Sequence, residues 1–263
     1  MRPIIIGLFA AILAAIALPS AAAFAATAPA KPAPPPPINP DARAKGKADA
    51  PALIKAANLT CTLADAREIG ESVDPKTKVK SVFYEVACKD AGGFVLATHG
   101  PGVPPDVATC LEVAGSPAAC ILPADLDPKA QLAALTTRLD PTCTVSGAKG
   151  VGHATDGSKT VFEVACANGD GFMLETSYPF DPSKPAKLMP CIVYDASTAK
   201  CSLTDAAAHA AQMDRVAAGA LKDCVVKDRR YMGGDAAGKL YYEFSCQTGK
   251  GYIVPQTPDF ASG

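Results

Sequence analysis

The sequence predicts an α+β protein built from three tandem, disulfide-stapled repeat units of about 80 residues each, the last of them truncated. The first observation is a motif that occurs three times. In it an aromatic residue, Glu, an apolar residue, a small residue and Cys are followed, five residues after the Cys, by Gly and another aromatic residue. The copies begin at Tyr84, Phe162 and Tyr242. The second observation is that the cysteines recur with the same period.

These repeats divide the chain after its first 50 residues. Repeat unit 1 covers residues 51–125, repeat unit 2 covers 126–202, and the truncated repeat unit 3 covers 203–263. Within each unit the pattern predicts one helix followed by a three-stranded antiparallel meander.

The composition excludes several classes of partner. The formal net charge is −1 and the sequence pI is about 6.3, so no basic surface for nucleic acid or an anionic membrane is indicated. Aromatic residues make up 6% of the chain and Trp is absent, which predicts thin cores of Val, Leu, Ile and Ala. The ten cysteines would compensate, because small units with thin cores usually need covalent staples.

The first 50 residues have the pattern of an exported protein. Residues 1–25 predict a secretory signal peptide, with a charged start at Arg2, an apolar stretch over residues 4–18 and cleavage after Ala25. An uncleaved anchor is the alternative, but the apolar run is short for a span of roughly 20 residues. Residues 26–50 are rich in Ala, Pro and Lys and predict a flexible linker. We expect a periplasmic or secreted protein, in which cysteines form disulfides.

The cysteine spacing predicts the disulfide pairing. Units 1 and 2 contain four cysteines each and unit 3 contains two, with equivalent cysteines 78 to 82 residues apart. If the first cysteine of each unit pairs with the second and the third with the fourth, no cysteine is left unpaired. If the fourth cysteine paired instead with the first cysteine of the next unit, Cys61 and Cys246 would be left without partners. The predicted bridges are Cys61–Cys88, Cys110–Cys120, Cys143–Cys166, Cys191–Cys201 and Cys224–Cys246. No C-x-x-C pair occurs and His is sparse, so no metal or cofactor is predicted.

Each predicted helix precedes the first cysteine of its unit. In unit 2, Asp127 is the expected N-cap before Pro128, and Leu132, Leu135 and Leu139 share one face. In unit 3 the expected cap is Thr204, with Met213, Val216 and Ala220 on the apolar face. In unit 1 a short helix is expected from Pro51 to about Asn58, capped by Asp49.

The repeated glutamate is the first candidate for chemistry. Strand interiors disfavour Glu, so three equivalent occurrences need a cause. A cation lies six residues after the first cysteine of each unit, on the strand expected to pair with the motif. The predicted structural ion pairs are Arg67–Glu85, Lys149–Glu163 and Arg230–Glu243. The alternative is acid–base catalysis, but a glycosidase needs two carboxylates facing one bond, and each unit repeats only one.

Other catalytic signals are weak. His99, His153 and His209 occupy non-equivalent positions in the three units. The sequence contains no G-x-S-x-G, H-E-x-x-H, P-loop or dinucleotide-binding motif. An enzyme is therefore disfavoured, although triads dispersed along a chain leave that class open.

The nine-residue loops between the third and fourth cysteines, residues 111–119 and 192–200, are candidate binding elements. We call them the stapled loops. A loop closed by a disulfide is pre-organised, which lowers the entropy cost of binding. Their candidate binding residues are Glu112, Ser116, Tyr194, Asp195 and Ser197. Redox activity of their cysteines is disfavoured, because redox-active dithiols usually lie close together in sequence.

The sequence thus predicts a non-enzymatic repeat protein of the bacterial envelope that presents strand edges and stapled loops to a partner. The expected partner is an envelope protein or a cell-surface polysaccharide, and not a nucleic acid. The alternatives are an envelope hydrolase that uses the strand glutamates, a thiol–disulfide protein, and a protease inhibitor that uses the stapled loops.

Overall fold

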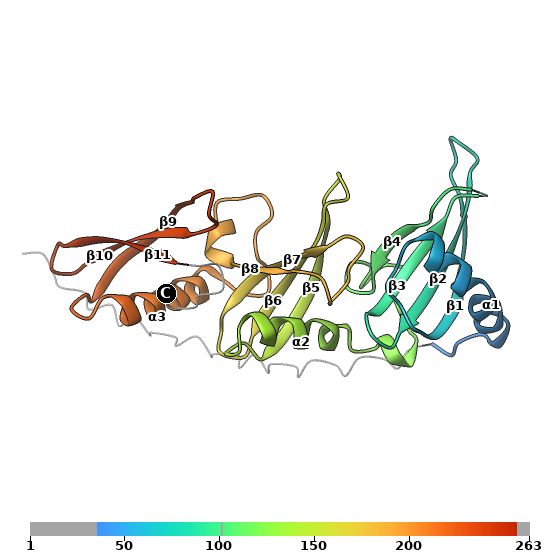
Figure 1. Cartoon of the computed structure of the whole chain (residues 1–263), viewed down its shortest axis with the longest axis horizontal. Coiled ribbons are helices and arrows are strands. Elements are labelled where there is room, and N and C mark those ends of the chain that lie inside the picture. The colour runs from blue at the N-terminus through green and yellow to red at the C-terminus, as the bar shows by residue number, and fades with distance from the viewer. Residues whose placement is uncertain (1–35, 101, 257–263) are drawn as a thin grey trace, which may run out of the picture. The chain divides into compact units, whose positions relative to one another are not determined.

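The computed structural model describes residues 36–100 and 102–256, and Figure 1 shows their fold. The described part of the chain is α+β, with two four-stranded sheets and one three-stranded sheet, all antiparallel. Each sheet lies within one of the three ranges predicted as repeat units, which we continue to call units 1, 2 and 3, and one α-helix lies against each sheet (Figure 1). The predicted signal peptide and residues 26–35 of the predicted linker lie outside the described residues.

The elements follow the same order in each unit. Unit 1, together with the residues before it from Pro40 on, contains α1 (Pro40–Ala56), β1 (Leu63–Val73), β2 (Lys80–Cys88), β3 (Gly92–Thr98), β4 (Asp106–Thr109) and the 3-10 turn η1 (Pro123–Asp125). Unit 2 contains α2 (Pro128–Leu139), β5 (Val145–His153), β6 (Lys159–Cys166), β7 (Gly171–Ser177), β8 (Lys187–Pro190) and the 3-10 turn η2 (Cys191–Tyr194). Unit 3 contains α3 (Ala206–Ala220), β9 (Val226–Gly234), β10 (Leu240–Cys246) and β11 (Gly251–Gln256).

The prediction of three strands per unit is wrong for units 1 and 2, which have a fourth. The order is β1-β2-β3-β4 in unit 1 and β5-β6-β7-β8 in unit 2, whereas unit 3 has only β11-β10-β9. Both β4 and β8 are four residues long and follow proline-containing loops. A segment this short gives no alternating pattern, so only its pairing with the preceding strand reveals it.

The prediction for the first helix is also wrong. Helix α1 begins at Pro40, with Asn39 as its N-cap, and runs through Pro51, so residues 40–50 are helical and not the flexible linker predicted for them. Asp49 is not the cap: its carboxylate accepts a hydrogen bond from the Tyr84 hydroxyl. Contacts with β1, distant in sequence, hold this polar helix. Their partners are Arg43–Asp65, Lys45–Glu68 and Lys47–Asp65.

The other two helices lie close to their predicted positions. Asp127 and Pro128 begin α2, with Leu132 and Leu135 buried. The N-cap of α3 is Asp205 rather than Thr204, because the Asp205 side chain accepts the Ala208 N–H. No helix among the described residues has the length and apolar character needed to cross a bilayer.

A β-bulge recurs in the first hairpin of each unit. The pairing register shifts between Glu68 and Gly70, and shifts likewise before Gly152 and Gly233. These three glycines have φ values of 155°, 134° and 142°. Residues with a Cβ rarely adopt such values, which explains why Gly recurs nine residues after the first cysteine.

Five disulfides staple the described residues, and they join the same pairs that the cysteine spacing predicts. They are Cys61–Cys88, Cys110–Cys120, Cys143–Cys166, Cys191–Cys201 and Cys224–Cys246. The described residues include no free cysteine. The bridge shared by all three units links a cysteine two residues before the first strand to the last residue of the motif strand, so it closes the hairpin that carries the repeated glutamate.

Each stapled loop also contacts the first strand of the following unit. The Gly150 N–H of β5 donates to the Leu111 carbonyl at 3.3 Å. A Cβ on Gly150 would lie 2.5 Å from backbone atoms of Glu112, so only Gly allows this approach. In unit 3, Tyr231 of β9 packs into an apolar cluster with Ile192 and Val193 of the second loop. The stapled loops therefore link neighbouring units.

Candidate functional site

The three repeated glutamates lie on the same face of their sheets, which we call the glutamate face. In each unit Glu stands opposite the predicted cation on one neighbouring strand and opposite an apolar residue on the other. The cross-strand partners are Arg67 and Val95 for Glu85, Lys149 and Met173 for Glu163, and Arg230 and Ile253 for Glu243. The hairpins thus place the glutamates beside the predicted cations.

In unit 1 the glutamate binds the end of the stapled loop. Glu85 is fully buried, and its Oε1 accepts the backbone N–H groups of Ile121 and Leu122 at 2.8 and 2.7 Å. The Arg67 Nε donates to Oε2 at 2.5 Å, and the same guanidinium donates to the Ala119 carbonyl at 3.2 Å. One ion pair therefore clamps the residues on both sides of Cys120.

In unit 2 the glutamate makes the equivalent contacts. Glu163, also buried, accepts the Ser202 N–H at 2.6 Å, the Leu203 N–H, and the Ser202 hydroxyl at 2.9 Å. The predicted direct ion pair with Lys149 is wrong. The Lys149 Nζ instead donates to Ser202 Oγ at 3.1 Å, so this hydroxyl stands between the two charges. The Ser202 hydroxyl donates to Glu163 Oε2, as the Arg67 guanidinium donates to Glu85 Oε2 in unit 1. Lys149 therefore does not need to reach the glutamate itself.

In unit 3 the equivalent glutamate binds no loop among the described residues. Arg230 pairs with Glu243, but this carboxylate receives no backbone N–H from the described residues. The Glu243 side chain is 40% exposed, against 0% for Glu85. The same sequence motif therefore produces two buried clamps and one accessible carboxylate.

Three equivalent glycines show what covers each glutamate face. A Cβ on Gly93 would lie 2.4 Å from the carboxyl carbon of Asp125 and from Cys110 Sγ. One on Gly171 would lie 2.1 Å from Thr204 Oγ1 and 3.0 Å from Cys191 Sγ. One on Gly251 would meet nothing nearer than a carbonyl at 4.0 Å. The loop disulfide and the segment after it thus cover the face in units 1 and 2, whereas no described residue covers the face of unit 3 at Gly251.

A second carboxyl lies against the Glu85 clamp. Asp125 is 2% exposed, and neither of its oxygens accepts a hydrogen bond. Desolvation by burial, followed by the charge of Glu85, raises the pKa of Asp125 to about 7. A proton on Asp125 would donate to Glu85 and relieve both effects. The buried pair resembles a shared-proton dyad in its chemistry, but the covering loop keeps substrate from reaching it.

The candidate binding residues of the stapled loops are mostly directed inward. Glu112 accepts the Thr109 N–H and hydroxyl, and Tyr194 donates to Glu175 at 3.5 Å. Burial and the neighbouring Glu175 raise the pKa of Tyr194 to about 12. The Ser197 hydroxyl oxygen is buried, while Ser116 is exposed and accepts the Ala118 N–H. Neither loop forms a hairpin: the first consists of turns and bends, and the second begins with the 3-10 turn η2.

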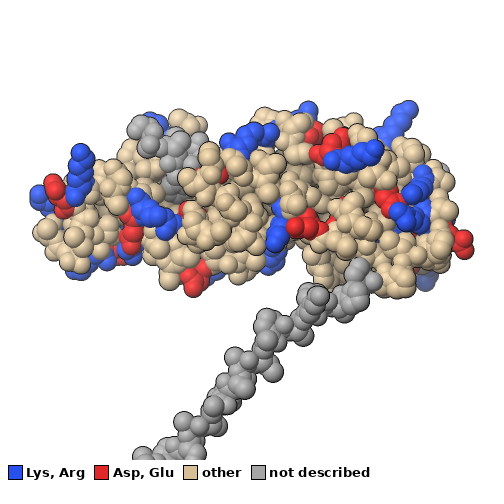
Figure 2. All heavy atoms as spheres, turned by 90° about the horizontal axis from the view of Figure 1, so that it is seen from below, with Lys and Arg blue, Asp and Glu red and all other residues tan. Residues whose placement is uncertain are grey.

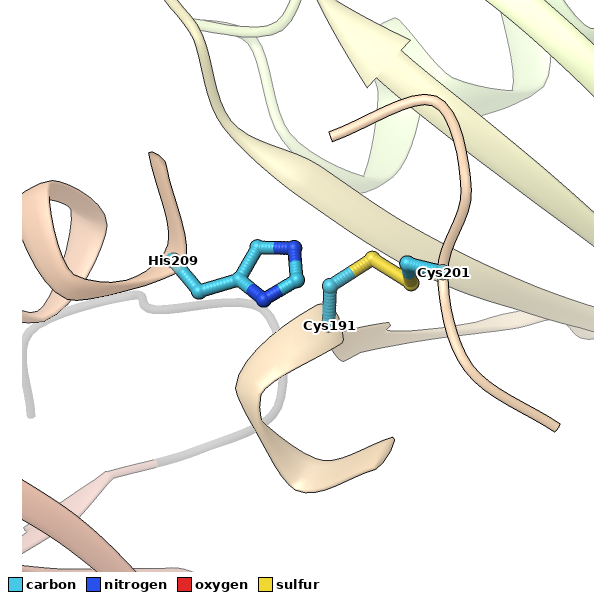
Figure 3. A group of neighbouring side chains, drawn as sticks. All are labelled: Cys191, Cys201 and His209. Carbon is cyan, nitrogen blue, oxygen red and sulfur yellow. A yellow bond between two sulfur atoms is a disulfide. The ribbon is translucent and has the colours of Figure 1, made fainter. Parts of the chain in front are cut away.

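His209 ties the second loop to α3. Its Nδ1 contacts Asp195 Oδ1 at 2.7 Å, and its Nε2 contacts Thr204 Oγ1 at 2.9 Å. Figure 3 shows the ring beside the Cys191–Cys201 disulfide. This hydroxyl–imidazole–carboxylate chain has the connectivity of a catalytic triad. The imidazole, however, is 2% exposed, so we assign it to packing.

The remaining histidines are closer to the surface. His99 contacts Ser81 Oγ through Nδ1 at 3.0 Å and Asp106 through Nε2 at 2.7 Å. Asp106 is largely exposed. His153 contacts Glu112 at 3.1 Å and stacks on Tyr178. The contacts of His99 hold the segment between β3 and β4 against β2, and the contact of His153 with Glu112 joins unit 2 to unit 1.

Two groups of described residues bring metal-ligand atoms together. One is Cys191, Cys201 and His209, and the other is Glu85, Cys110, Cys120 and Asp125. In both groups the two sulfurs are joined to each other. The thiolate is the sulfur species that ligates metals, so these groups do not supply a ligand set while the bridges are intact.

Charges on the surface are mixed. On the face shown in Figure 2, Lys and Arg side chains alternate with Asp and Glu side chains. Together with the net charge of −1, this gives no strong field of one sign on that face.

No family model, curated protein or solved structure matches the chain.

Replacing the clamp glutamate tests its structural role. We expect Glu163→Gln to lower the free energy of unfolding by about 3 kcal/mol, because the buried acceptor of two backbone N–H groups and the Ser202 hydroxyl loses its charge. The matched variant Glu243→Gln should cost about 1 kcal/mol or less, since its ion pair is exposed. Urea unfolding followed by circular dichroism measures both. Equal losses would contradict the assignment.

Asp125 makes stability depend on pH. A carboxyl whose pKa is about 7 in the folded state and about 3.9 when unfolded binds more protons folded. The free energy of unfolding therefore falls as pH rises from about 4 to 7, by as much as about 4 kcal/mol. We expect Asp125→Asn to be more stable than the parent at pH 8 and similar to it near pH 4, as measured by urea unfolding.

The control for this prediction is Asp127→Asn, which changes an exposed carboxyl two residues away that makes no capping hydrogen bond. It should not reproduce the gain in stability at pH 8 that we expect for Asp125→Asn, because its carboxyl is exposed. A pH-independent difference for Asp125→Asn would show that Asp125 does not titrate in this range.

Proposed function

We propose that the chain is a non-enzymatic, exported repeat protein that binds a partner in the bacterial envelope through its sheets and stapled loops. The observation that carries this proposal is the use of the repeated glutamate. In two units its carboxylate is fully engaged with backbone N–H groups, and in the third it is exposed beside an uncovered strand. The repeated residue thus builds a scaffold, and one copy of the scaffold has an accessible face.

The hydrolase alternative receives little support. Glu85 and Glu163 are buried beneath their loops, with exposed fractions of 0% and 1%. The exposed Glu243 has Arg230 as its ionic partner, and its cross-strand neighbour Ile253 is apolar. The carboxylate that β9 carries on the same face, Asp228 opposite Ser245, accepts the Arg229 N–H, so no pair of free carboxylates faces one bond.

The other two alternatives are also less well supported. In each stapled loop one cysteine of the bridge is buried, Cys110 or Cys191, and the other, Cys120 or Cys201, is half-buried. The described residues include no free cysteine beside either bridge to attack it. A protease inhibitor needs a loop that projects into a cleft. Glu112 and Tyr194 instead bind their own unit, and η2 packs against β9.

Capture by the intact chain tests the proposal. We expect the immobilised, disulfide-bonded protein to retain the same component of an envelope fraction, either a protein or a polysaccharide, in a saturable manner. The matched control is the same chain reduced and alkylated, which should lose this retention because the scaffold unfolds. If the oxidised protein retains nothing reproducible, the binding function is wrong.

A further inference from the structure

We propose that the open glutamate face of unit 3 is a docking site for an extended polypeptide segment of another protein. The segment would add a short strand to β11 and place two successive backbone N–H groups on Glu243. This inference rests on the proposed binding function and specifies its partner chemistry. Units 1 and 2 carry the argument, because they contain the same site with its occupant in place.

The apolar residue opposite the glutamate shows that the site is uncovered. Val95 is 4% exposed and Met173 is 1% exposed, whereas the equivalent Ile253 is 59% exposed. In units 1 and 2 a fourth strand pairs with the strand that carries this residue. In the described residues, β11 pairs only with β10, so one edge of unit 3 presents unpaired backbone groups.

The two existing occupants define the chemistry of the expected ligand. Each is a four-residue antiparallel strand followed by a closed loop and then by two backbone N–H groups on the glutamate. The side chain opposite Val95 is Ala108 and the one opposite Met173 is Met189, both uncharged. A matching segment for unit 3 would place a small or apolar side chain against Ile253.

The free edge of β11 favours the addition of a short strand over pairing with the β11 strand of a second copy of this chain. Pro255 stands where Ala97 of unit 1 pairs with β4, and it has no N–H to donate. An added strand can therefore pair along Gly251 and Ile253 but not far beyond them. A polypeptide segment also explains the charge: the Glu243 carboxylate is an acceptor for N–H donors, as in the other units.

Further apolar surface adjoins the site. An open hollow beside Ile253 is lined by Met232, Gly233, Gly234, Tyr241 and Ile253. Met232 is itself largely exposed. The hollow lies next to the bulge at Gly233, where the strand twists away from its neighbour, and it offers room for a side chain of the docked segment.

A peptide taken from the chain itself tests the site. The probe is a synthetic peptide of residues 187–204 with the Cys191–Cys201 bridge formed, which is the occupant of the equivalent site in unit 2. We expect it to bind the full chain with 1:1 stoichiometry in isothermal titration, and to slow hydrogen exchange of the Ile253 N–H. The absence of saturable binding up to about 1 mM peptide would overturn the proposal.

Two variants locate the binding. Gly251→Ala meets open space in the unbound chain and should leave the melting temperature unchanged, but a Cβ there would collide with the docked loop, as it would at Gly171. We expect it to weaken binding by about tenfold or more, and Glu243→Gln to weaken it by about fivefold to tenfold. The matched control Gly219→Ala, a glycine with open space in α3, should bind normally. Unchanged affinity in both site variants would contradict the inference.

The outcomes for partner class are distinct. A second copy as occupant would appear as concentration-dependent self-association that the peptide does not compete. If the envelope component captured by the intact chain is retained equally by Gly251→Ala, the docking inference is wrong while the binding function stands. If nothing is captured but the peptide binds as described, the site exists and the proposed envelope function is wrong.

Discussion

The structure depends on a carboxylate that binds the backbone of a loop. In units 1 and 2 a strand glutamate takes two consecutive N–H groups from the residues that follow the fourth cysteine. Burial makes these charge-assisted bonds strong and makes their loss costly. The disulfide fixes the loop and the glutamate fixes its exit, so the loop can serve as a rigid contact to the next unit. A thin core with few aromatic residues is stabilised by these local connections.

The repeat made much of this predictable. The threefold motif and the cysteine spacing indicated an α+β architecture with hairpins closed by disulfides, and the register opposed the glutamates to the predicted cations. The N-terminal part of α1 was not predictable, because Ala- and Lys-rich sequence becomes helical here through ion pairs with β1. The role of Glu85 was also hidden, since its backbone partners lie 36 and 37 residues away and carry no side-chain signal.

Comparison among the units gives more information than any one of them. Position for position, Gly93, Gly171 and Gly251 are the same residue in the same motif, yet two are pressed against a loop and one faces open space. A glycine that is required in two copies and merely present in the third suggests a site whose occupant differs. The exposed Ile253 and the accessible Glu243 are consistent with this view, since neither is needed for the core of unit 3.

The most direct test of the clamp is native-state hydrogen exchange on the disulfide-intact, 263-residue protein. If the glutamates hold the loop exits, the N–H groups of Ile121, Leu122, Ser202 and Leu203 exchange slowly, at rates close to those of the strand interiors. The Ile253 N–H, at an unpaired edge, exchanges quickly. Fast exchange at the four loop-exit positions would show that the carboxylates do not hold these segments in solution, and would contradict the account.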